Sequence, residues 1–185
     1  MATVKQLINE AESKLDAEYK DVNVAKVLFY HLANKEPHEL YLMYDEEVDP
    51  ELEAKFLAGM EEYYQGRPIQ YIKGVETFFG RDFKVNEDVL IPRYETEELV
   101  ENILYHIDDY FSDYQTIDLC DVGTGSGAIA ISLALEEPRT NVYASDISSK
   151  AIEVAKENAA NLGANVNFMV GDLLEPLLEK EIKVD

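Results

Sequence analysis

The stretch DVGTGSG, residues 121–127, decides the fold, because it joins a β-rich segment to an apolar helical one. Residues 116–122 are predicted to form a strand, and a helix is predicted after Gly127. Glycines at a strand-to-helix turn allow a sharp bend and let a ligand approach the backbone without meeting a Cβ. The helix that follows presents free N–H groups, so the stretch predicts a site for a negative or electron-rich ligand.

Strands and helices alternate on the C-terminal side of this stretch. Further strands are predicted at residues 141–145 and 165–170, with a helix at 148–162 that Gly163 ends. Strand, helix, strand, helix, strand is the pattern of half a Rossmann-like unit with a parallel sheet. The fold class is therefore α/β.

The N-terminal part is predicted to be helical, and its capping residues mark four helices. Thr3 and Asp21 are candidate N-caps, Pro37 is expected to open a short helix that ends at Met43, and Asp49 precedes a fourth helix. These helices form a small domain that comes before the α/β part.

A β-rich segment connects the two parts. It alternates apolar and polar residues, and Gly80-Arg81 is placed to form the turn between two short strands. We therefore divide the chain into a helical domain at 1–73, a β-hairpin linker at 74–91 and an α/β domain at 92–185. A further helix, beginning after Pro92, is expected before the first strand of the sheet.

Acidic residues follow the ends of the predicted parallel strands. Asp146 ends the second strand, 19 residues after Gly127, where a carboxylate can accept hydrogen bonds from both hydroxyls of a ribose. The third strand ends at Gly171-Asp172-Leu173, where a purine ring can lie beside the main chain. An adenosine ligand fits all three strand ends.

The loop differs from a dinucleotide-binding loop. Its pattern is acid-x-Gly-x-Gly-x-Gly, and Asp121 would repel a pyrophosphate but attract the ammonium group of an amino acid. This favours S-adenosylmethionine over NAD, although a carboxylate at a strand end can also cap neighbouring N–H groups. The predicted cofactor-binding residues are Asp121, Gly123, Thr124, Gly125, Ser126, Gly127, Asp146, Asp172 and Leu173.

Composition argues against several other functions. The 185 residues include 16 Lys and Arg against 38 Asp and Glu, a net charge of −22, which opposes binding to nucleic acid. The longest apolar run, residues 128–135, is far shorter than the about 20 residues of a membrane span, and no signal peptide is recognisable. A single cysteine cannot form a disulfide within the chain, which fits a cytoplasmic protein. The cysteine and the three histidines have no metal-ligand spacing, so we expect no metal site.

The motifs resemble those of known enzymes. The glycine loop with Asp146 resembles the class I S-adenosylmethionine-dependent methyltransferases, and the segments GRPIQYIKG (66–74) and LIPRYETE (90–97) narrow the resemblance to the HemK family. These are N5-glutamine methyltransferases of peptide chain release factors, and the resemblance covers the whole chain. One departure is Tyr94, where the family usually has a proline after the Pro-Arg pair.

The resemblance implies methylation of the glutamine amide nitrogen in the Gly-Gly-Gln motif of class 1 release factors. An amide nitrogen is a weak nucleophile, so the reaction depends on orientation. In the family an Asn-Pro-Pro-Tyr motif at the end of the fourth strand holds the amide, and this chain contains no such motif before its last residue, Asp185. We therefore expect a C-terminally truncated and inactive enzyme, with no catalytic residue of its own and with residues 182–185 beginning the fourth strand.

Two alternatives stay open. The chain can be a non-catalytic binding module, or part of another amino-directed methyltransferase, since related enzymes share the cofactor loop. The acidic charge and the lack of basic clusters count against a nucleic-acid substrate. An NAD-dependent oxidoreductase would bind a different cofactor, so cofactor selectivity distinguishes it from either kind of methyltransferase.

Overall fold

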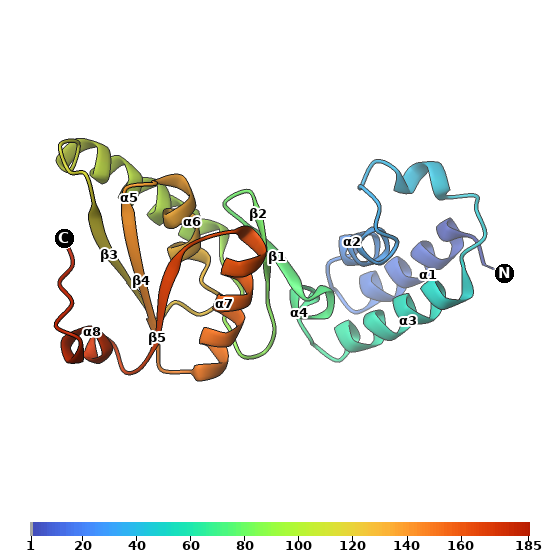
Figure 1. Ribbon diagram of the computed structural model, residues 1–185. Coiled ribbons are helices and arrows are strands. Elements are labelled where there is room, and N and C mark those ends of the chain that lie inside the picture. Colours follow the sequence, from blue (N-terminus) through green and yellow to red (C-terminus); the bar gives the residue numbers. More distant parts are fainter. Residues whose placement is uncertain (1) are drawn as a thin grey trace. The chain divides into compact units, whose positions relative to one another are not determined.

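The computed structural model describes residues 2–185, and the chain divides into two compact units, Met1–Lys73 and Gly74–Asp185. The first unit is helical (Figure 1). Its elements, in chain order, are α1 (Val4–Ala17), α2 (Asn23–Leu32), the 3-10 helix η1 (Leu40–Met43), α3 (Pro50–Tyr64) and α4 (Ile69–Lys73).

Capping residues explain where two of these helices begin. Thr3 Oγ1 accepts a hydrogen bond from the Gln6 N–H at 3.3 Å, while Gln6 Oε1 accepts one from the Thr3 N–H at 3.0 Å. Asp49 Oδ1 accepts from the N–H groups of Glu51 and Leu52, and Pro50 occupies the first turn of α3. The predicted starts of α1 and α3 are confirmed.

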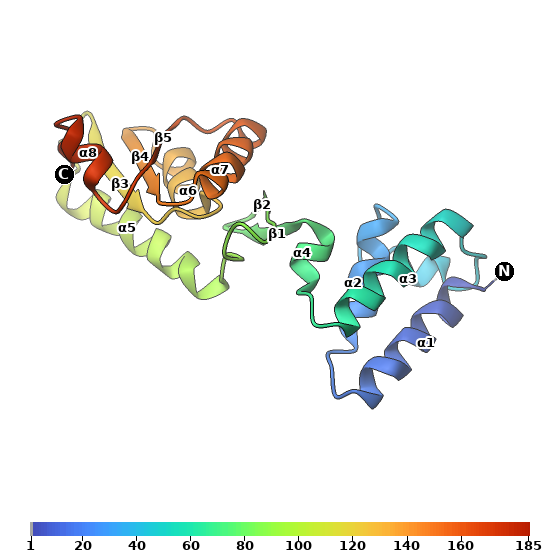
Figure 2. The ribbon, with the colours of Figure 1, turned by 90° about the horizontal axis from the view of Figure 1, so that it is seen from below.

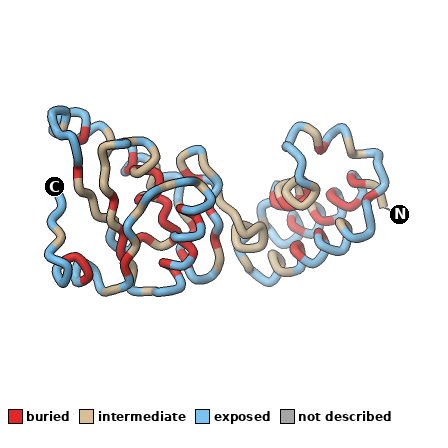
Figure 3. The backbone as a smooth tube through the Cα atoms, in the orientation of Figure 1, coloured by how far each residue is buried: buried red, intermediate tan, exposed pale blue. Residues whose placement is uncertain are grey.

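Apolar side chains on the inner faces of these helices form one core. Buried positions recur along each helix with exposed ones between them (Figure 3). Leu15, Leu28, Phe29 and Phe56 are fully buried, and the Phe29 and Phe56 rings meet edge to face. Burial of these side chains, rather than helix propensity alone, stabilises short helices of this length.

Two predictions for this unit are wrong in detail. Asp21 lies one position too early to cap α2: its Oδ1 accepts from the Asn23 N–H at 2.9 Å, and Val22 occupies the N-cap. Pro37 opens no α-helix; turns follow it, and the only helical residues there are the 3-10 turn η1. The short helix α4 escaped prediction because five residues are too few to display a helical repeat.

The second unit begins with an antiparallel hairpin of β1 (Val75–Phe78) and β2 (Arg81–Lys84). The turn is Phe79-Gly80 and not Gly80-Arg81, because Arg81 already pairs with Phe78. Both turn residues have positive φ, 49° and 71°, as tight hairpin turns require. The Phe79 N–H donates to Glu97 Oε1 at 2.8 Å, which helps to hold Phe79 in this uncommon conformation.

Alternating strands and helices follow the hairpin, and the prediction of an α/β fold with a parallel sheet is confirmed. The sheet has the order β3-β4-β5, and α6 and α7 both pack on β4 (Figure 2). The elements are η2 (Tyr94–Thr96), α5 (Glu97–Tyr110), β3 (Ile117–Val122), α6 (Ala128–Glu136), β4 (Thr140–Asp146), α7 (Ser149–Leu162), β5 (Val166–Val170) and α8 (Glu175–Glu179).

One apolar core joins the hairpin to the sheet. Phe78 and Phe83 of the hairpin are buried in the same cluster as Val100 of α5, Ile131 of α6 and Ala144 of β4. The hairpin therefore belongs to the second unit. Residues 182–185 form no strand, although the Asp185 N–H donates to the Asp118 carbonyl of β3 at 2.9 Å.

Candidate cofactor site

The loop after β3 contains three glycines in the left-handed conformation, with φ of 77° at Gly123, 56° at Gly125 and 83° at Gly127. A Cβ added at Gly123 or Gly125 would meet no atom within 4 Å, so these residues present bare backbone to open space. A Cβ at Gly127 would lie 2.8 Å from Ile131 Cδ1 and 3.1 Å from Ala155 Cβ. Two glycines thus leave room for a ligand, and the third lets α6 pack against α7.

Asp146, the last residue of β4, fixes this loop. Its Oδ2 accepts from the Gly125 N–H at 2.9 Å, and its Oδ1 accepts from the Ser148 N–H at 2.9 Å. Each carboxylate oxygen can accept about two hydrogen bonds, so both keep acceptor capacity. Asp146 is therefore able to hold the loop and to accept hydrogen bonds from a pair of ligand hydroxyls.

Asp121 is half-buried beside the same loop. Its Oδ2 accepts from the Thr124 hydroxyl at 2.7 Å. Burial raises the pKa of its carboxyl, and the charge of Asp146 raises it further, while the Thr124 hydrogen bond opposes the shift. No basic side chain among residues 2–185 forms an ion pair with Asp121, so a ligand ammonium would supply a counter-charge that the described chain lacks.

The end of β5 lies next to the end of β4. The Gly171 N–H donates to the Asp146 carbonyl at 3.0 Å, and the Ser145 hydroxyl donates to the Leu173 carbonyl at 2.8 Å. The Leu173 side chain is 67% exposed, and Asp172 is exposed as well. The structure thus brings the ends of β4 and β5 together, and both side chains predicted near a purine are accessible to a ligand.

A small cavity of about 130 Å³ lies between the glycine loop and the segment that precedes α5. Arg93 and Thr96 line it together with Gly123 and Gly125. Of the residues in the described part of the chain that line this cavity, Arg93 alone is charged, and it is exposed. The pattern of residues 90–97 supports the resemblance but does not by itself predict a role for Arg93, whose one local signal is the run of mostly acidic residues that follows it.

Asn158 is a second residue that sequence reasoning missed. It is only 1% exposed, and its Oδ1 accepts from the Lys84 N–H at 2.7 Å. Its Nδ2 donates to the Lys84 carbonyl at 3.0 Å and to the Ser126 carbonyl at 2.9 Å. Through these three hydrogen bonds, the buried Asn158 amide holds the glycine loop to β2. An Asn on the alanine-rich face of α7, between Ala155 and Ala159, was the only sign of this role.

Two further properties concern the described residues as a whole. Residues 2–185 contain no group of three or more His, Cys, Asp or Glu side chains placed to hold a metal ion. None of the helices within that range is long and apolar enough to cross a membrane.

Known proteins resemble both parts of the chain. A family model described as "PrmC N-terminal domain" matches residues 6–74, and one described as "Methyltransferase domain" matches residues 115–185. The chain is 43% identical over 182 residues to the release factor glutamine methyltransferase of Bacillus anthracis and 42% identical over 185 residues to that of Bacillus subtilis strain 168. These alignments cover 98% and 100% of this chain but 64% of each relative.

Solved structures match part of this chain as well. The tRNA (uracil-54, C5)-methyltransferase of Pyrococcus abyssi, in complex with S-adenosyl-L-homocysteine, superposes with a TM-score of 0.43. Its sequence is 21% identical, and the match covers 53% of this chain and 23% of that chain.

Proposed function

Because this chain belongs to the family of release factor glutamine methyltransferases, we propose that the whole protein methylates the glutamine amide nitrogen in the Gly-Gly-Gln motif of class 1 release factors. The observation that carries the proposal is the 43% identity to such an enzyme over 98% of the chain, across both units. The chain spans 64% of the length of the relatives that it matches.

S-adenosylmethionine is the cofactor, and it supplies a methyl group bound to a sulfonium. We propose that Asp146 accepts hydrogen bonds from its ribose, and that the bare backbone of Gly123 and Gly125 lies against the methionine and ribose. Asp121 attracts the ammonium end of the methionine, and Arg93, on the cavity at the same loop, attracts its carboxylate. Asp172 and Leu173 lie near the adenine.

Asp121 gives a prediction that separates stability from binding. The pKa of the Asp121 carboxyl is raised above its ordinary 3.8, which means that the folded state favours the neutral form. The contribution of Asp121 to the stability of the fold is therefore lost as the pH rises through the raised pKa. The neutral Asp121→Asn variant, which can still accept the Thr124 hydrogen bond, is expected to unfold at a higher temperature than wild type at pH 7. The gain should shrink as the pH falls through the raised pKa.

The same substitution is expected to weaken binding of S-adenosylhomocysteine about tenfold or more at pH 7, because one charge-assisted hydrogen bond of about 1.5–3 kcal/mol is lost. Wild-type affinity should approach that of the variant as the pH falls and Asp121 becomes protonated. Thermal unfolding and calorimetric titration over a pH series measure both effects. An Asp121→Asn protein that is less stable at pH 7, or that binds as tightly as wild type, would contradict this role.

We propose that the segment which holds the substrate amide lies beside β3 in the whole protein. Among residues 2–185, β3 pairs with a strand on one side only, where β4 lies. A cavity of about 320 Å³ lies along β3, lined by Leu119 and Cys120 of that strand and by Val184. An open strand edge next to an apolar cavity is a surface that a further strand covers.

The first unit is proposed to recognise the release factor, and the cytoplasm, where translation ends, is the proposed location. Residues 1–73 contain eight basic and fifteen acidic residues, and the whole chain has a net charge of −22. This charge favours a protein partner of the first unit over a nucleic acid.

The direct test is methylation of a class 1 release factor by the full-length enzyme with S-adenosylmethionine, followed by peptide mass spectrometry. We expect one added methyl group on the Gly-Gly-Gln peptide, located on the glutamine. A release factor in which this glutamine is replaced by glutamate is the control and should stay unmodified. Methylation at another residue, or none, would contradict the proposed substrate.

A further inference from the structure

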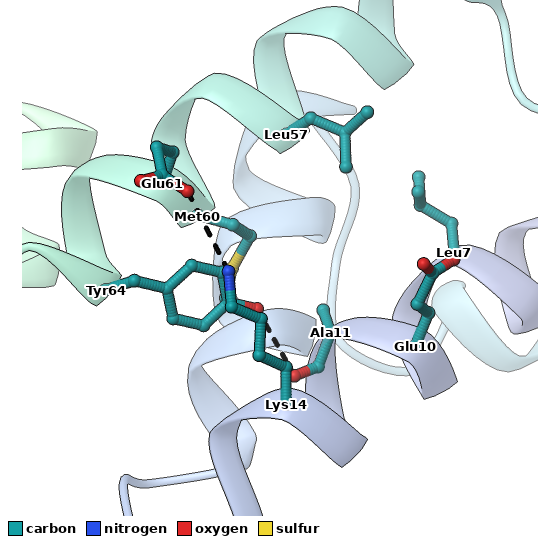
Figure 4. Close-up of a pocket in the computed structure, with 8 residues that line it drawn as sticks. All are labelled: Leu7, Glu10, Ala11, Lys14, Leu57, Met60, Glu61 and Tyr64. Atoms are coloured by element: carbon teal, nitrogen blue, oxygen red, sulfur yellow. Dashed lines mark hydrogen bonds and ion pairs between the residues drawn. The ribbon is translucent and has the colours of Figure 1, made fainter. Parts of the chain in front are cut away.

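A groove in the first unit has no part in the cofactor site. It has a volume of about 350 Å³ and lies between α1 and α3, and we call it the α1–α3 groove. Leu7, Ala11 and Met60 form a buried apolar floor, and Leu57 on its edge is 52% exposed. Figure 4 shows side chains of both helices around this space. The groove offers apolar surface that a partner side chain can remove from water.

One end of the α1–α3 groove is held in place by polar contacts. Lys14 Nζ lies 3.6 Å from the centroid of the Tyr64 ring and 3.8 Å from Glu61 Oε2. The Tyr64 hydroxyl donates to the Ala11 carbonyl at 3.4 Å. These groups lie together in Figure 4, away from Leu7 and Glu10. Contacts within the chain therefore fix this end of the groove before any partner binds.

The charge around the groove is negative. Burial raises the pKa of Tyr64, and the carboxylates of Glu18, Glu61 and Glu10 raise it further. Glu18 and Glu61 each form an ion pair with a lysine, whereas Glu10 has neither an ion pair nor a side-chain hydrogen bond within residues 2–185. Glu10 is thus an exposed carboxylate on the rim that can accept a positive group from a partner.

We propose that the α1–α3 groove binds the protein substrate through a segment that presents an aliphatic side chain beside a lysine or arginine. The aliphatic side chain covers the floor and contacts Leu57, and the cation reaches Glu10. This inference rests on the proposed function, which makes a release factor the substrate. A second copy of the chain fits poorly, because it would bring another acidic surface against this one.

The test titrates a class 1 release factor into the 185-residue chain and into the variants Leu57→Glu and Glu10→Lys. Both positions are exposed, so the helices should form normally. Each variant is expected to bind the release factor about tenfold more weakly, because Leu57→Glu sets a charge against the aliphatic side chain of the partner and Glu10→Lys sets two positive charges against each other. Leu42→Glu and Glu36→Lys make the same changes at exposed positions outside the groove and should bind within about twofold of wild type.

Titration of each variant with S-adenosylhomocysteine tells the two proposals apart. If wild type binds the release factor and both groove variants bind it equally well, the groove assignment is wrong and the proposed function stands. If wild type binds S-adenosylhomocysteine but no release factor, the groove does not bind the substrate and this inference is overturned, while methylation by the full-length enzyme decides separately whether the proposed function stands. A concentration-dependent dimer that Leu57→Glu abolishes would show that a second copy fills the groove, which would also overturn the inference.

Discussion

Replacing Asp146 with alanine is expected to lower the affinity for S-adenosylhomocysteine about a hundredfold or more. The substitution removes the acceptor for both proposed ribose hydrogen bonds, and charge-assisted bonds contribute about 1.5–3 kcal/mol each. Two such bonds at the lower limit amount to about 3 kcal/mol, which is a factor of about a hundred in Kd. The Gly125 and Ser148 N–H groups also lose their partner, so the loop becomes less ordered.

Calorimetric titration measures this effect, and two further variants serve as controls. Asp146→Asn keeps one oxygen acceptor but loses the charge, so its affinity should fall between those of wild type and Asp146→Ala. Asp113→Ala removes an exposed aspartate elsewhere in the same unit and should leave binding unchanged. Unchanged affinity in Asp146→Ala would show that this carboxylate does not hold the ligand.

Gly127→Ala is expected to lower the free energy of unfolding of the second unit by about 2–4 kcal/mol. A left-handed alanine costs about 1 kcal/mol relative to glycine. The added Cβ would lie 2.8 Å from Ile131 Cδ1 and 3.1 Å from Ala155 Cβ, and overpacking of this kind costs about 1–3 kcal/mol more. Ala155 leaves little freedom to adjust, because its clash involves a Cβ fixed to the backbone of α7.

Gly163→Ala provides a matched control for this prediction. Gly163 has a φ of 72°, close to the 83° of Gly127, but an added Cβ there would meet no atom within 4 Å. Its substitution should therefore cost only the about 1 kcal/mol of left-handed strain. Urea unfolding followed by circular dichroism gives both values. Equal losses in the two variants would mean that the contact of α6 with α7 does not require a glycine.

Local signals explain which parts of the fold could be predicted. Thr3 and Asp49 satisfy helix N–H groups within three residues, so sequence alone locates the starts of α1 and α3. The hairpin turn could not be placed correctly in this way. Glycine favours a turn, but the hydrogen bond from the Phe79 N–H to Glu97, 18 residues away, helps to place a phenylalanine in it. Pro37 likewise gave a local signal for an α-helix that the fold does not form.

The sequence alone predicts those parts of the candidate site that lie at the ends of strands. The glycine pattern and Asp146 lie at strand ends, and parallel strands bring their carboxyl ends to one edge. Asn158 and Arg93 were missed because their importance comes from contacts that join distant segments. Asn158 reaches Lys84, 74 residues away, and Arg93 reaches the loop only through the packing of the segment before α5.

The described chain is expected to form a site for S-adenosylmethionine. Calorimetric titration of the 185-residue chain with S-adenosylhomocysteine and, separately, with NAD tests it most directly. We predict one site per chain and an affinity for S-adenosylhomocysteine about a hundredfold or more above that for NAD, since Asp121 repels a pyrophosphate and attracts an ammonium. Equal or tighter binding of NAD, or no binding of S-adenosylhomocysteine, would contradict the claim.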